Sequence, residues 1–432
     1  MAKLGAFCDA ATGHINPMTA LLRRMQQRGH QVVFFGVADT EKRVRDRGIN
    51  FHLIGQQDFP LGTIRSLDRR LGELQGRAAM NFAFDRAVKL ARMTLRDSPQ
   101  AIRDENIDAL LVDEIDMAGN VAEYLGMPFV SVAIIPPLLR VSTMPPFCFG
   151  WKAGLDPISR LRNRIGHSFV NRIAQPIYAA INEQRRAWGL KPIDGIFDIL
   201  SPLARVSQLP AALEFHQVDA PLLHYAGPFV DHEQRPHVDF PWERLDGRRP
   251  LIYASLGTMQ NGVEGVYRTI AEACAGVDAQ LILSLGGGLD PEHLGPLPGD
   301  PIVVRFAPQL DLVKRAALVI THAGINTTLE SLSEGVPLVA LPIANDQPGV
   351  AARVAARGAG IVIPIRKLDV EKLRRAVRAV IEDGRYRAAA ENLAHAINRV
   401  DGLDFAADVI ELALRIGPVP VSQTQASWAL GG

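Results

Sequence analysis

Several features are scarce in this 432-residue chain, and each absence excludes a class of protein. Its three cysteines, Cys8, Cys148 and Cys274, are widely separated and form no C-x-x-C pair, so neither a disulfide framework nor a zinc site is expected. The net charge is only +1, which gives no basic field, and we expect no nucleic-acid partner. The chain contains no run of about 18 apolar residues, the length that a membrane-spanning helix needs. The first apolar stretch breaks at Asp9, too early for a signal peptide, so a cytoplasmic protein is expected.

Apolar runs of strand length alternate with segments of helical period along most of the chain. The runs are continuous rather than alternating, as in parallel sheets that helices cover on both faces. The predicted strands are 4–8, 31–35, 109–112, 129–133, 251–255, 280–284, 302–305, 318–321 and 338–340. This pattern predicts an α/β fold with doubly wound, Rossmann-like sheets.

A stretch rich in proline and charge interrupts the alternation near the middle of the chain, which indicates a linker between two domains. The predicted segments are an N-terminal domain over 1–228, a linker over 229–249, a C-terminal domain over 250–416 and a flexible tail over 417–432. Two such domains face each other across a cleft, and ligands bind there at the carboxyl ends of the strands.

The segment 321–330, T-H-A-G-I-N-T-T-L-E, follows an apolar strand and opens a helix. Gly324 would allow a tight turn, and the free N–H groups of the helix end favour a phosphate or pyrophosphate. Three side chains could add hydrogen bonds to that anion: His322, Asn326 and Thr327. One turn further, Glu330 could accept bonds from ribose hydroxyls. The alternative is a purely structural capping box with Glu330 as its acid.

Three further strand ends of the second half should face the same cleft. They carry hydroxyls and a glycine suited to phosphate, an aromatic ring and an amide suited to a base, and a carboxylate with an amide suited to sugar hydroxyls. These residues are Ser255, Gly257 and Thr258; Phe306 and Gln309; and Asp346 and Gln347. Together with the preceding helix end they predict a nucleotide-sugar site.

The first predicted strand is followed by T-G-H-I-N-P, with Pro17 suited to a first helical turn beginning at about Asn16. His14 would face the cleft from the opposite domain, where a neutral imidazole can take a proton from a hydroxyl. Asp113, which ends another predicted strand, is the expected partner that fixes its tautomer. Glu114 and Asp116 are alternatives.

The motifs F-A-P-Q, H-A-G-I-N-T-T-x-E, G-V-P and D-Q, in this order between Phe306 and Gln347, resemble the donor signature of the inverting UDP-glycosyltransferases, which have the GT-B fold. The resemblance implies a base site, a pyrophosphate site, a ribose site and a sugar site. Phe306 and Gln309 would form the base site, and His322, Asn326 and Thr327 the pyrophosphate site. Glu330 would bind the ribose, and Asp346 with Gln347 the sugar. It implies that His14 is the catalytic base and Asp113 its partner. Plant members have tryptophan where Phe306 and Ile325 stand here, so the base contact must differ and thymidine stays an alternative to uridine.

The co-substrate implied by the resemblance is UDP-glucose, and no bound cofactor is expected. The chain contains no D-x-D triplet, which fits a metal-independent site in which the helix end takes the place of a cation. A UDP-sugar epimerase and a non-catalytic sugar-nucleotide binder are alternatives on the same fold. The loop at His14 with Asp113 favours transfer.

The acceptor should bind against the aromatic loop 145–151, where Pro146, Phe147 and Trp151 are candidates. Stretches such as P-P-F at 145–147 and N-D-Q-P-G-V-A-A-R at 345–353 are similar to the bacterial branch that glucosylates carotenoids such as zeaxanthin. The resemblance therefore implies a lipophilic carotenoid acceptor, with a macrolide or another natural product as the alternative.

After this loop, apolar residues recur every four positions, which predicts an amphipathic helix. Pro176 should kink this helix. Between residues 159 and 188 it carries six arginines and one acidic residue, a local charge of +5. Such a basic helix could contact the inner face of a membrane, and a solvated arginine face over a packed helix is the alternative.

Overall fold

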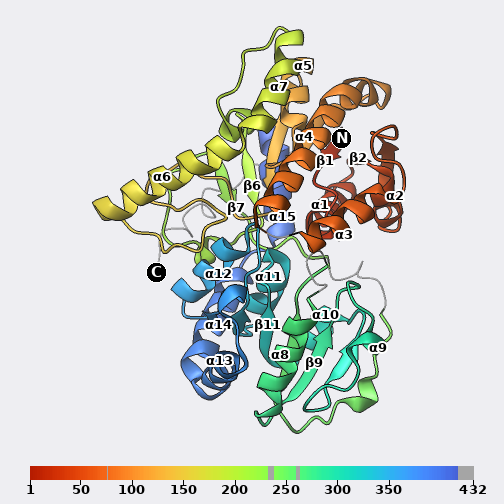
Figure 1. The fold of residues 1–432 in the computed structure, drawn as a ribbon. Coiled ribbons are helices and arrows are strands. Elements are labelled where there is room, and N and C mark those ends of the chain that lie inside the picture. The colour runs from red at the N-terminus through yellow and green to blue at the C-terminus, as the bar shows by residue number, and fades with distance from the viewer. Residues whose placement is uncertain (75, 232–237, 259–262, 417–432) are drawn as a thin grey trace.

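In a computed structural model, residues 1–74, 76–231, 238–258 and 263–416 are described. They form two α/β domains, and the N-terminal domain lies above the C-terminal one in Figure 1. The N-terminal sheet has the strand order β3-β2-β1-β4-β5-β6-β7, and the C-terminal sheet has the order β10-β9-β8-β11-β12-β13. Neighbouring strands are parallel in both sheets. The GT-B fold class expected from the sequence is confirmed.

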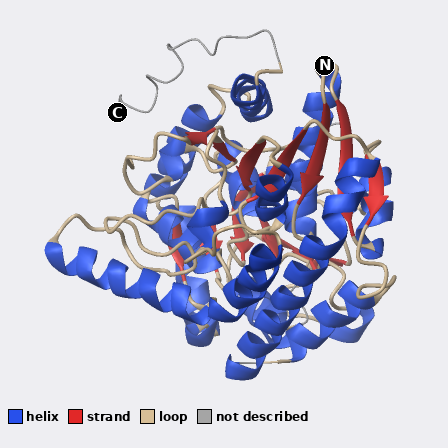
Figure 2. Ribbon diagram, turned by 90° about the horizontal axis from the view of Figure 1, so that it is seen from above, coloured by secondary structure: helices blue, strands red, loops and turns tan. Residues whose placement is uncertain are grey.

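The N-terminal domain contains strands β1 (Lys3–Phe7), β2 (Gln31–Gly36), β3 (Asn50–Leu53), β4 (Ala109–Asp113), β5 (Phe129–Ala133), β6 (Arg205–Ser207) and β7 (Leu223–Tyr225). Its helices are α1 (Thr12–Gln27), α2 (Ala38–Arg45), α3 (Thr63–Glu73), α4 (Gly76–Asp104), α5 (Ala118–Leu125), α6 (Pro157–Ile173) and α7 (Gln175–Ala187), with short 3-10 turns η1 (Ile196–Ile199) and η2 (Ala211–Leu213). Helices cover both faces of the sheet, as Figure 2 shows from above.

The C-terminal sheet contains β8 (Leu251–Ser255), β9 (Gln280–Ser284), β10 (Ile302–Val304), β11 (Ala316–Thr321), β12 (Leu338–Ala340) and β13 (Gly360–Val362). The helices after the linker are α8 (Glu264–Ala275), α9 (Pro291–Leu294), α10 (Gln309–Val313), α11 (Ile325–Ser333), α12 (Gln347–Ala356), α13 (Val370–Glu382), α14 (Gly384–Ile397) and α15 (Gly402–Leu414), with 3-10 turns η3 (Trp242–Arg244) and η4 (Ile365–Lys367). Two apolar clusters, one on each face, form the core of this sheet.

Each of the nine predicted apolar runs is a strand of these sheets, shifted by at most two residues. Four strands were not predicted: β3, β6, β7 and β13. Each has only three or four residues. A charged or imidazole side chain interrupts the apolar run in β3, β6 and β7, and β13 is apolar but only three residues long.

The last helix corrects the predicted domain limits. Residues up to 416 were assigned to the C-terminal domain, yet α15 packs into the core of the N-terminal domain through Leu403, Ala406 and Ile410 (Figure 1). Arg28 of α1 also pairs with Asp408 of α15 at 2.6 Å. The apolar face of α15 is covered by α1, β5 and β6 of the first domain. The predicted tail, 417–432, lies outside the described residues.

Candidate active site

The carboxyl ends of β1 and β4 bring His14 and Asp113 together. These strands are paired in parallel, with Phe7 opposite Val112. The Nδ1 atom of His14 lies 2.5 Å from Oδ2 of Asp113, whose side chain is fully buried. Because Nδ1 faces the carboxylate, Nε2 is the nitrogen that remains to accept a proton.

The helix that carries His14 begins earlier than expected, and Pro17 explains how. α1 begins at Thr12 rather than at about Asn16, so Pro17 lies inside the helix and not in its first turn. A proline has no N–H to donate to the carbonyl four residues before it, which is that of Gly13. The Gly13 carbonyl instead accepts a hydrogen bond of 2.9 Å from the Asn326 side chain of the other domain.

The two alternative partners of His14 have other roles in the structure. Glu114 is buried and pairs with Arg205 at 2.6 Å, while its other oxygen accepts the N–H of Leu138. Asp116 accepts the N–H of Ala118 at the start of α5. Asp113 is therefore the carboxylate in contact with His14.

Electrostatics make His14 a strong base in the free protein. Burial alone would lower its pKa, but the charge and hydrogen bond of Asp113 outweigh burial and raise the pKa to about 9, with smaller contributions from Asp9 and Asp346. The last of these carboxylates belongs to the other domain, so the field at His14 depends on how the two domains meet.

The second histidine of the cleft, His322, is tightly enclosed at the end of β11. A Cβ atom added to Gly257 would lie 2.6 Å from its ring, and one added to Gly324 would lie 2.4 Å from Nε2. Burial lowers the pKa of His322 to about 4, so the ring is neutral at physiological pH. A neutral ring can still donate one N–H to an anion.

The structure needs a glycine at position 324 for a different reason from the predicted one. Its φ is −60°, which any residue adopts, and the left-handed residue of this turn is Ala323 at φ 63°. Gly324 is required for space beside His322 rather than for the turn. It is also the N-cap of α11, with no side-chain cap, so the capping-box alternative is wrong.

Three predicted donor residues form one hydrogen-bonded group around Gln309. Its Nε2 donates to Oε2 of Glu330 at 2.5 Å and to Oγ1 of Thr327 at 3.2 Å, while its Oε1 accepts the hydroxyl of Tyr253 at 3.0 Å. Tyr253 has no counterpart in the sequence prediction, because it lies inside an apolar strand. The group fixes both the amide and the carboxylate before any ligand arrives.

The remaining donor candidates follow strands β8 and β10. Ser255 ends β8 and accepts the N–H of Gly257 at 3.4 Å. Gly257 has a φ of 77°, and Thr258 is exposed. The Phe306 ring is 48% exposed and lies against Gly287, which leaves an aromatic face available to a base.

Asp346 and Gln347 begin α12 and contribute differently from one another. Burial raises the pKa of Asp346 to about 6, although His14 and Arg353 act in the opposite direction. The Oε1 atom of Gln347 accepts the N–H groups of Ile343 and Ala344 at 2.8 and 3.0 Å. The carbonyl of Gln347 therefore holds its own loop, and its NH₂ group is the part suited to an external hydroxyl.

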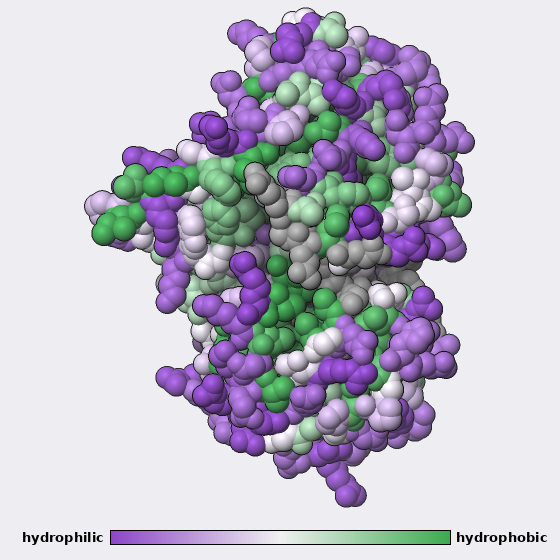
Figure 3. All heavy atoms as spheres, in the orientation of Figure 1, coloured by the Kyte–Doolittle hydropathy of each residue, from purple (hydrophilic) through white to green (hydrophobic). Residues whose placement is uncertain are grey.

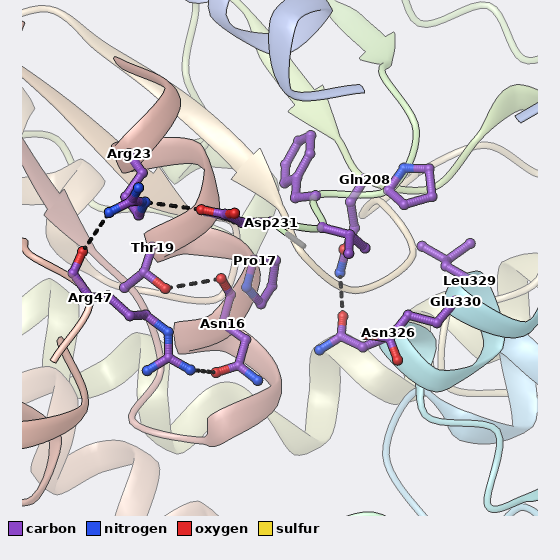
Figure 4. Close-up of a pocket in the computed structure, with 14 residues that line it drawn as sticks. Asn16, Pro17, Thr19, Arg23, Arg47, Gln208, Asp231, Asn326, Leu329 and Glu330 are labelled. Atoms are coloured by element: carbon purple, nitrogen blue, oxygen red, sulfur yellow. Dashed lines mark hydrogen bonds and ion pairs between the residues drawn. The ribbon is translucent and has the colours of Figure 1, made fainter. Parts of the chain in front are cut away.

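A narrow cleft, lined by residues of both domains, separates α1 from α11. Figure 4 shows Asn16 and Pro17 on one side and Asn326 and Glu330 on the other. Gln208 lies between them and donates to Oδ1 of Asn326 at 3.0 Å. Gln208 was not predicted from the sequence, because its role depends on where two distant segments meet.

A second contact between the domains also escaped prediction. Glu214 and Arg353 form a buried ion pair with two hydrogen bonds, of 2.8 and 3.2 Å, and the Arg353 guanidinium lies 4.7 Å from the centre of the Phe215 ring. Arg353 belongs to α12, so the pair fixes the helix that begins with Gln347 against the N-terminal domain. Arg353 ends the N-D-Q-P-G-V-A-A-R stretch, but nothing in the sequence marks Glu214 as its partner.

The predicted acceptor loop reaches the start of α12. Pro146 is buried and Phe147 and Trp151 are half-buried. A methyl group on Gly349 would overlap the Phe147 carbonyl, and Gly150 lies against Pro348. The loop thus contacts the first turn of α12, next in sequence to Asp346 and Gln347.

Within the described part of the chain, no group of three or more His, Cys, Asp or Glu side chains is placed to hold a metal ion. All three cysteines are free. None of the described helices has the length and apolar character needed to cross a membrane.

The chain is similar in sequence and in structure to known glycosyltransferases. A model of the family described as UDP-glucoronosyl and UDP-glucosyl transferase matches residues 207–418. A zeaxanthin glucosyltransferase from Pantoea ananas is 30% identical over 434 residues, which cover 100% of both chains. One from Pseudescherichia vulneris is 32% identical over 353 residues, 80% of this chain and 82% of that protein. Among solved structures, the glycotransferase of kitacinnamycin has a TM-score of 0.74 at 23% identity, covering 95% of this chain and 98% of that chain.

The two parallel sheets and the likeness to solved structures define the GT-B fold. With a relative 30% identical along its full length, the chain belongs to the UDP-glucuronosyl and UDP-glucosyl transferase family, and it is a sugar-transferring enzyme that uses a UDP-sugar donor.

Proposed function

We propose that this enzyme transfers glucose from UDP-glucose to a hydroxyl of a carotenoid such as zeaxanthin, with inversion at the anomeric carbon. The observation that carries the proposal is the His14–Asp113 pair, with its 2.5 Å contact, at the same cleft as α11 and α12 of the other domain. Similarity over the full length to a zeaxanthin glucosyltransferase supports the acceptor class.

The donor would lie along the strand ends of the C-terminal sheet. The exposed face of Phe306 would stack on the uracil, and Glu330 would accept the ribose hydroxyls. The diphosphate would lie at the N-terminus of α11, where the backbone N–H groups and the neutral His322 donate to it. Asp346 and the NH₂ group of Gln347 would bind the hydroxyls of the sugar.

The reaction would be a single displacement. The acceptor hydroxyl gives its proton to Nε2 of His14 while its oxygen forms the new bond to the anomeric carbon. The bond from that carbon to the diphosphate oxygen breaks with its electron pair, and UDP leaves. Asp113 stabilises the imidazolium, and the N-terminal end of α11 stabilises the departing diphosphate. No resident metal takes part in this scheme.

The acceptor would bind against the loop that contains Pro146, Phe147 and Trp151, beside the sugar. A carotenoid diol is long and apolar, and it resides in a membrane. We therefore assign the enzyme to the cytoplasm, with peripheral contact to the inner face of the membrane. That location brings UDP-glucose and the acceptor to the same cleft from opposite environments.

A matrix of donors and acceptors tests the proposal. UDP-glucose, other UDP-hexoses and TDP-sugars are each incubated with carotenoid diols, macrolides and flavonoids, and the products are identified by mass spectrometry. The expected product is a carotenoid glucoside from UDP-glucose. A matrix with products on macrolides alone would reject the acceptor, and preferential use of TDP-sugars would reject the donor.

Two controls separate transfer from other activities on this fold. UDP-glucose without an acceptor should not epimerise, and the anomeric configuration of the product, read by NMR coupling, should be β from an α-linked donor. An α-linked product would reject the single displacement.

A further inference from the structure

An apolar stripe on α6 faces solvent. Ile158, Leu161, Ile165 and Phe169 follow one another at intervals of three or four residues and are 81, 58, 61 and 53% exposed. This spacing places them on one side of the helix. α6 projects from the body of the molecule, and its apolar side chains form the green band along the protruding arm in Figure 3. Exposed apolar rows of this kind mark interaction sites.

The apolar repeat of α6 continues into α7, where its side chains pack against the core instead of facing solvent. The expected amphipathic helix is two helices, α6 and α7, which separate at Ala174 just before Pro176. In α7 the repeat enters the core, where Ile181 is buried. Arg185 of α7 is also buried and pairs with Glu123 at 2.7 Å. Only the α6 half of the basic segment therefore presents both its apolar and its charged side chains to the outside.

The charges on α6 favour one kind of partner. Three arginines of the helix, Arg160, Arg164 and Arg172, are exposed, and the helix has no aspartate or glutamate after its N-cap, Asp156. Arginines beside an apolar stripe suit an anionic lipid surface, since the rings and methyl groups enter the acyl region while the guanidinium groups stay at the headgroups. A second copy of the same helix would bring two sets of positive charges together, which is unfavourable.

The opposite side of α6 rests on the predicted acceptor loop and on the residues just before it. Asn163 donates to the Ser142 carbonyl at 2.9 Å, His167 donates to the Met144 carbonyl at 3.0 Å, and Gly166 packs against Pro146 and Trp151. The Arg162 guanidinium lies 4.9 Å from the centre of the Trp151 ring. The same loop borders the start of α12, so the stripe and the sugar site are joined by one continuous segment.

We propose that α6 docks the enzyme on an anionic lipid bilayer, with the stripe Ile158, Leu161, Ile165 and Phe169 inserted at the headgroup boundary. The docked helix would place the loop at 145–151 next to the membrane surface, where a lipophilic acceptor can pass from the bilayer into the cleft. This inference deepens the function proposed above and rests on it for its purpose. Lipid binding itself can be measured without an acceptor or a donor.

Flotation of the full chain with vesicles tests the docking. Vesicles of phosphatidylcholine alone are compared with vesicles of phosphatidylcholine and phosphatidylglycerol. The wild type should float with the anionic vesicles. The double variant Ile165→Ser/Phe169→Ser should lose about tenfold or more of its partition, because two apolar side chains no longer insert. Arg160→Gln/Arg164→Gln should lose about tenfold, and added salt should weaken wild-type binding.

Matched controls keep the test specific. Leu412→Ser removes an apolar side chain of similar exposure from α15, and Arg186→Gln removes an exposed arginine from α7; both should bind like the wild type. The stripe side chains are exposed, so the melting temperature should stay unchanged. Equal binding to neutral and anionic vesicles, or equal binding of the double variant and the wild type, overturns the proposal.

Two further outcomes are distinct. If the wild type is a dimer without lipid and Ile165→Ser/Phe169→Ser makes it a monomer, the stripe is an interface between copies and lipid docking is rejected. If flotation behaves as expected but no carotenoid diol is glucosylated, the docking stands and the acceptor proposal fails.

Discussion

The two halves of the cleft each place a histidine after a parallel strand, and the protein gives the two rings opposite properties. His14 contacts a buried carboxylate, and its pKa is raised to about 9. His322 lies between two glycines without a carboxylate contact, and burial lowers its pKa to about 4. Burial acts in the same direction on both rings, so the contact with Asp113 makes the difference.

This contrast separates the two tasks of a transferase. A ring that must take a proton needs a neighbouring negative charge to stabilise the imidazolium. A ring beside a diphosphate needs only to donate a hydrogen bond, and its fixed, neutral state avoids a dependence on pH. We propose that the same residue type thus serves as base in one domain and as ligand in the other.

The largest effect is expected for His14→Ala. Loss of the base should lower kcat about 10² to 10⁴-fold, with UDP affinity unchanged. His322→Ala should instead weaken UDP binding. Calorimetric titration with UDP and steady-state kinetics of both variants measure the contrast. Weakened UDP binding in His14→Ala with kcat preserved would reverse the assignment.

Asp113→Asn should alter the pH dependence. The base form of His14 is the neutral one, so kcat/KM of the wild type should rise with pH up to about 9. Without the carboxylate the pKa of His14 falls, and the rise should move to lower pH, toward the ordinary histidine value of about 6.5. The variant should lose most at alkaline pH, on the order of 10²-fold, and less near neutrality. A profile that keeps its wild-type midpoint in Asp113→Asn would contradict this role.

A moderate effect is expected from the glycines around His322. Gly324→Ala has no backbone strain, but its methyl group would overlap the ring, and we expect a loss of roughly 1–3 kcal/mol in the free energy of unfolding together with weaker UDP binding. Gly257→Ala adds strain because its φ is 77°. Gly62→Ala is the control: its φ is 92°, nothing lies near its added methyl group, and UDP binding should be unchanged. If Gly62→Ala weakens UDP binding as much as Gly324→Ala, the enclosure of His322 is irrelevant to the donor.

The smallest effect should come from removing metal ions. EDTA should leave the transfer rate unchanged, because the helix end at α11 takes the part that a cation would otherwise take. Rates are measured with and without EDTA and then with added Mg²⁺ or Mn²⁺. A rate lost to EDTA and restored by Mn²⁺ would show that the donor half depends on a cation.

The strand ends were predictable because their signals are local. Runs such as 129–133 and 280–284 are continuous and apolar, and their limits were predicted to the residue. Once the sheets were assigned as parallel, the carboxyl ends had to meet at one edge, which brought His14 to Asp113. The start of α1 was missed because Pro17 was taken as a first-turn residue, whereas a partner from another domain makes a proline tolerable inside the helix.

The contacts between domains were not predictable, because they depend on distances between segments far apart in the chain. Gln208 meets Asn326, and Glu214 meets Arg353, each across more than 100 positions. The tight turn was assigned to Gly324, whereas Ala323 is its left-handed residue, since the sequence does not reveal that a ring occupies the space beside the glycine. Contacts of this kind depend on how distant segments pack together, and the residues next to each position in the sequence do not reveal that packing.

The return of α15 to the first domain has a mechanical consequence. The chain crosses between the domains twice, once after β7 and once between α14 and α15. One crossing would let the second domain tilt in any direction, whereas two restrict it mainly to rotation about the line that joins them. The route by which the cleft opens for UDP-sugar and closes for reaction is therefore constrained by covalent connectivity. An exchange of this domain between relatives would need two cuts, with the final helix left behind.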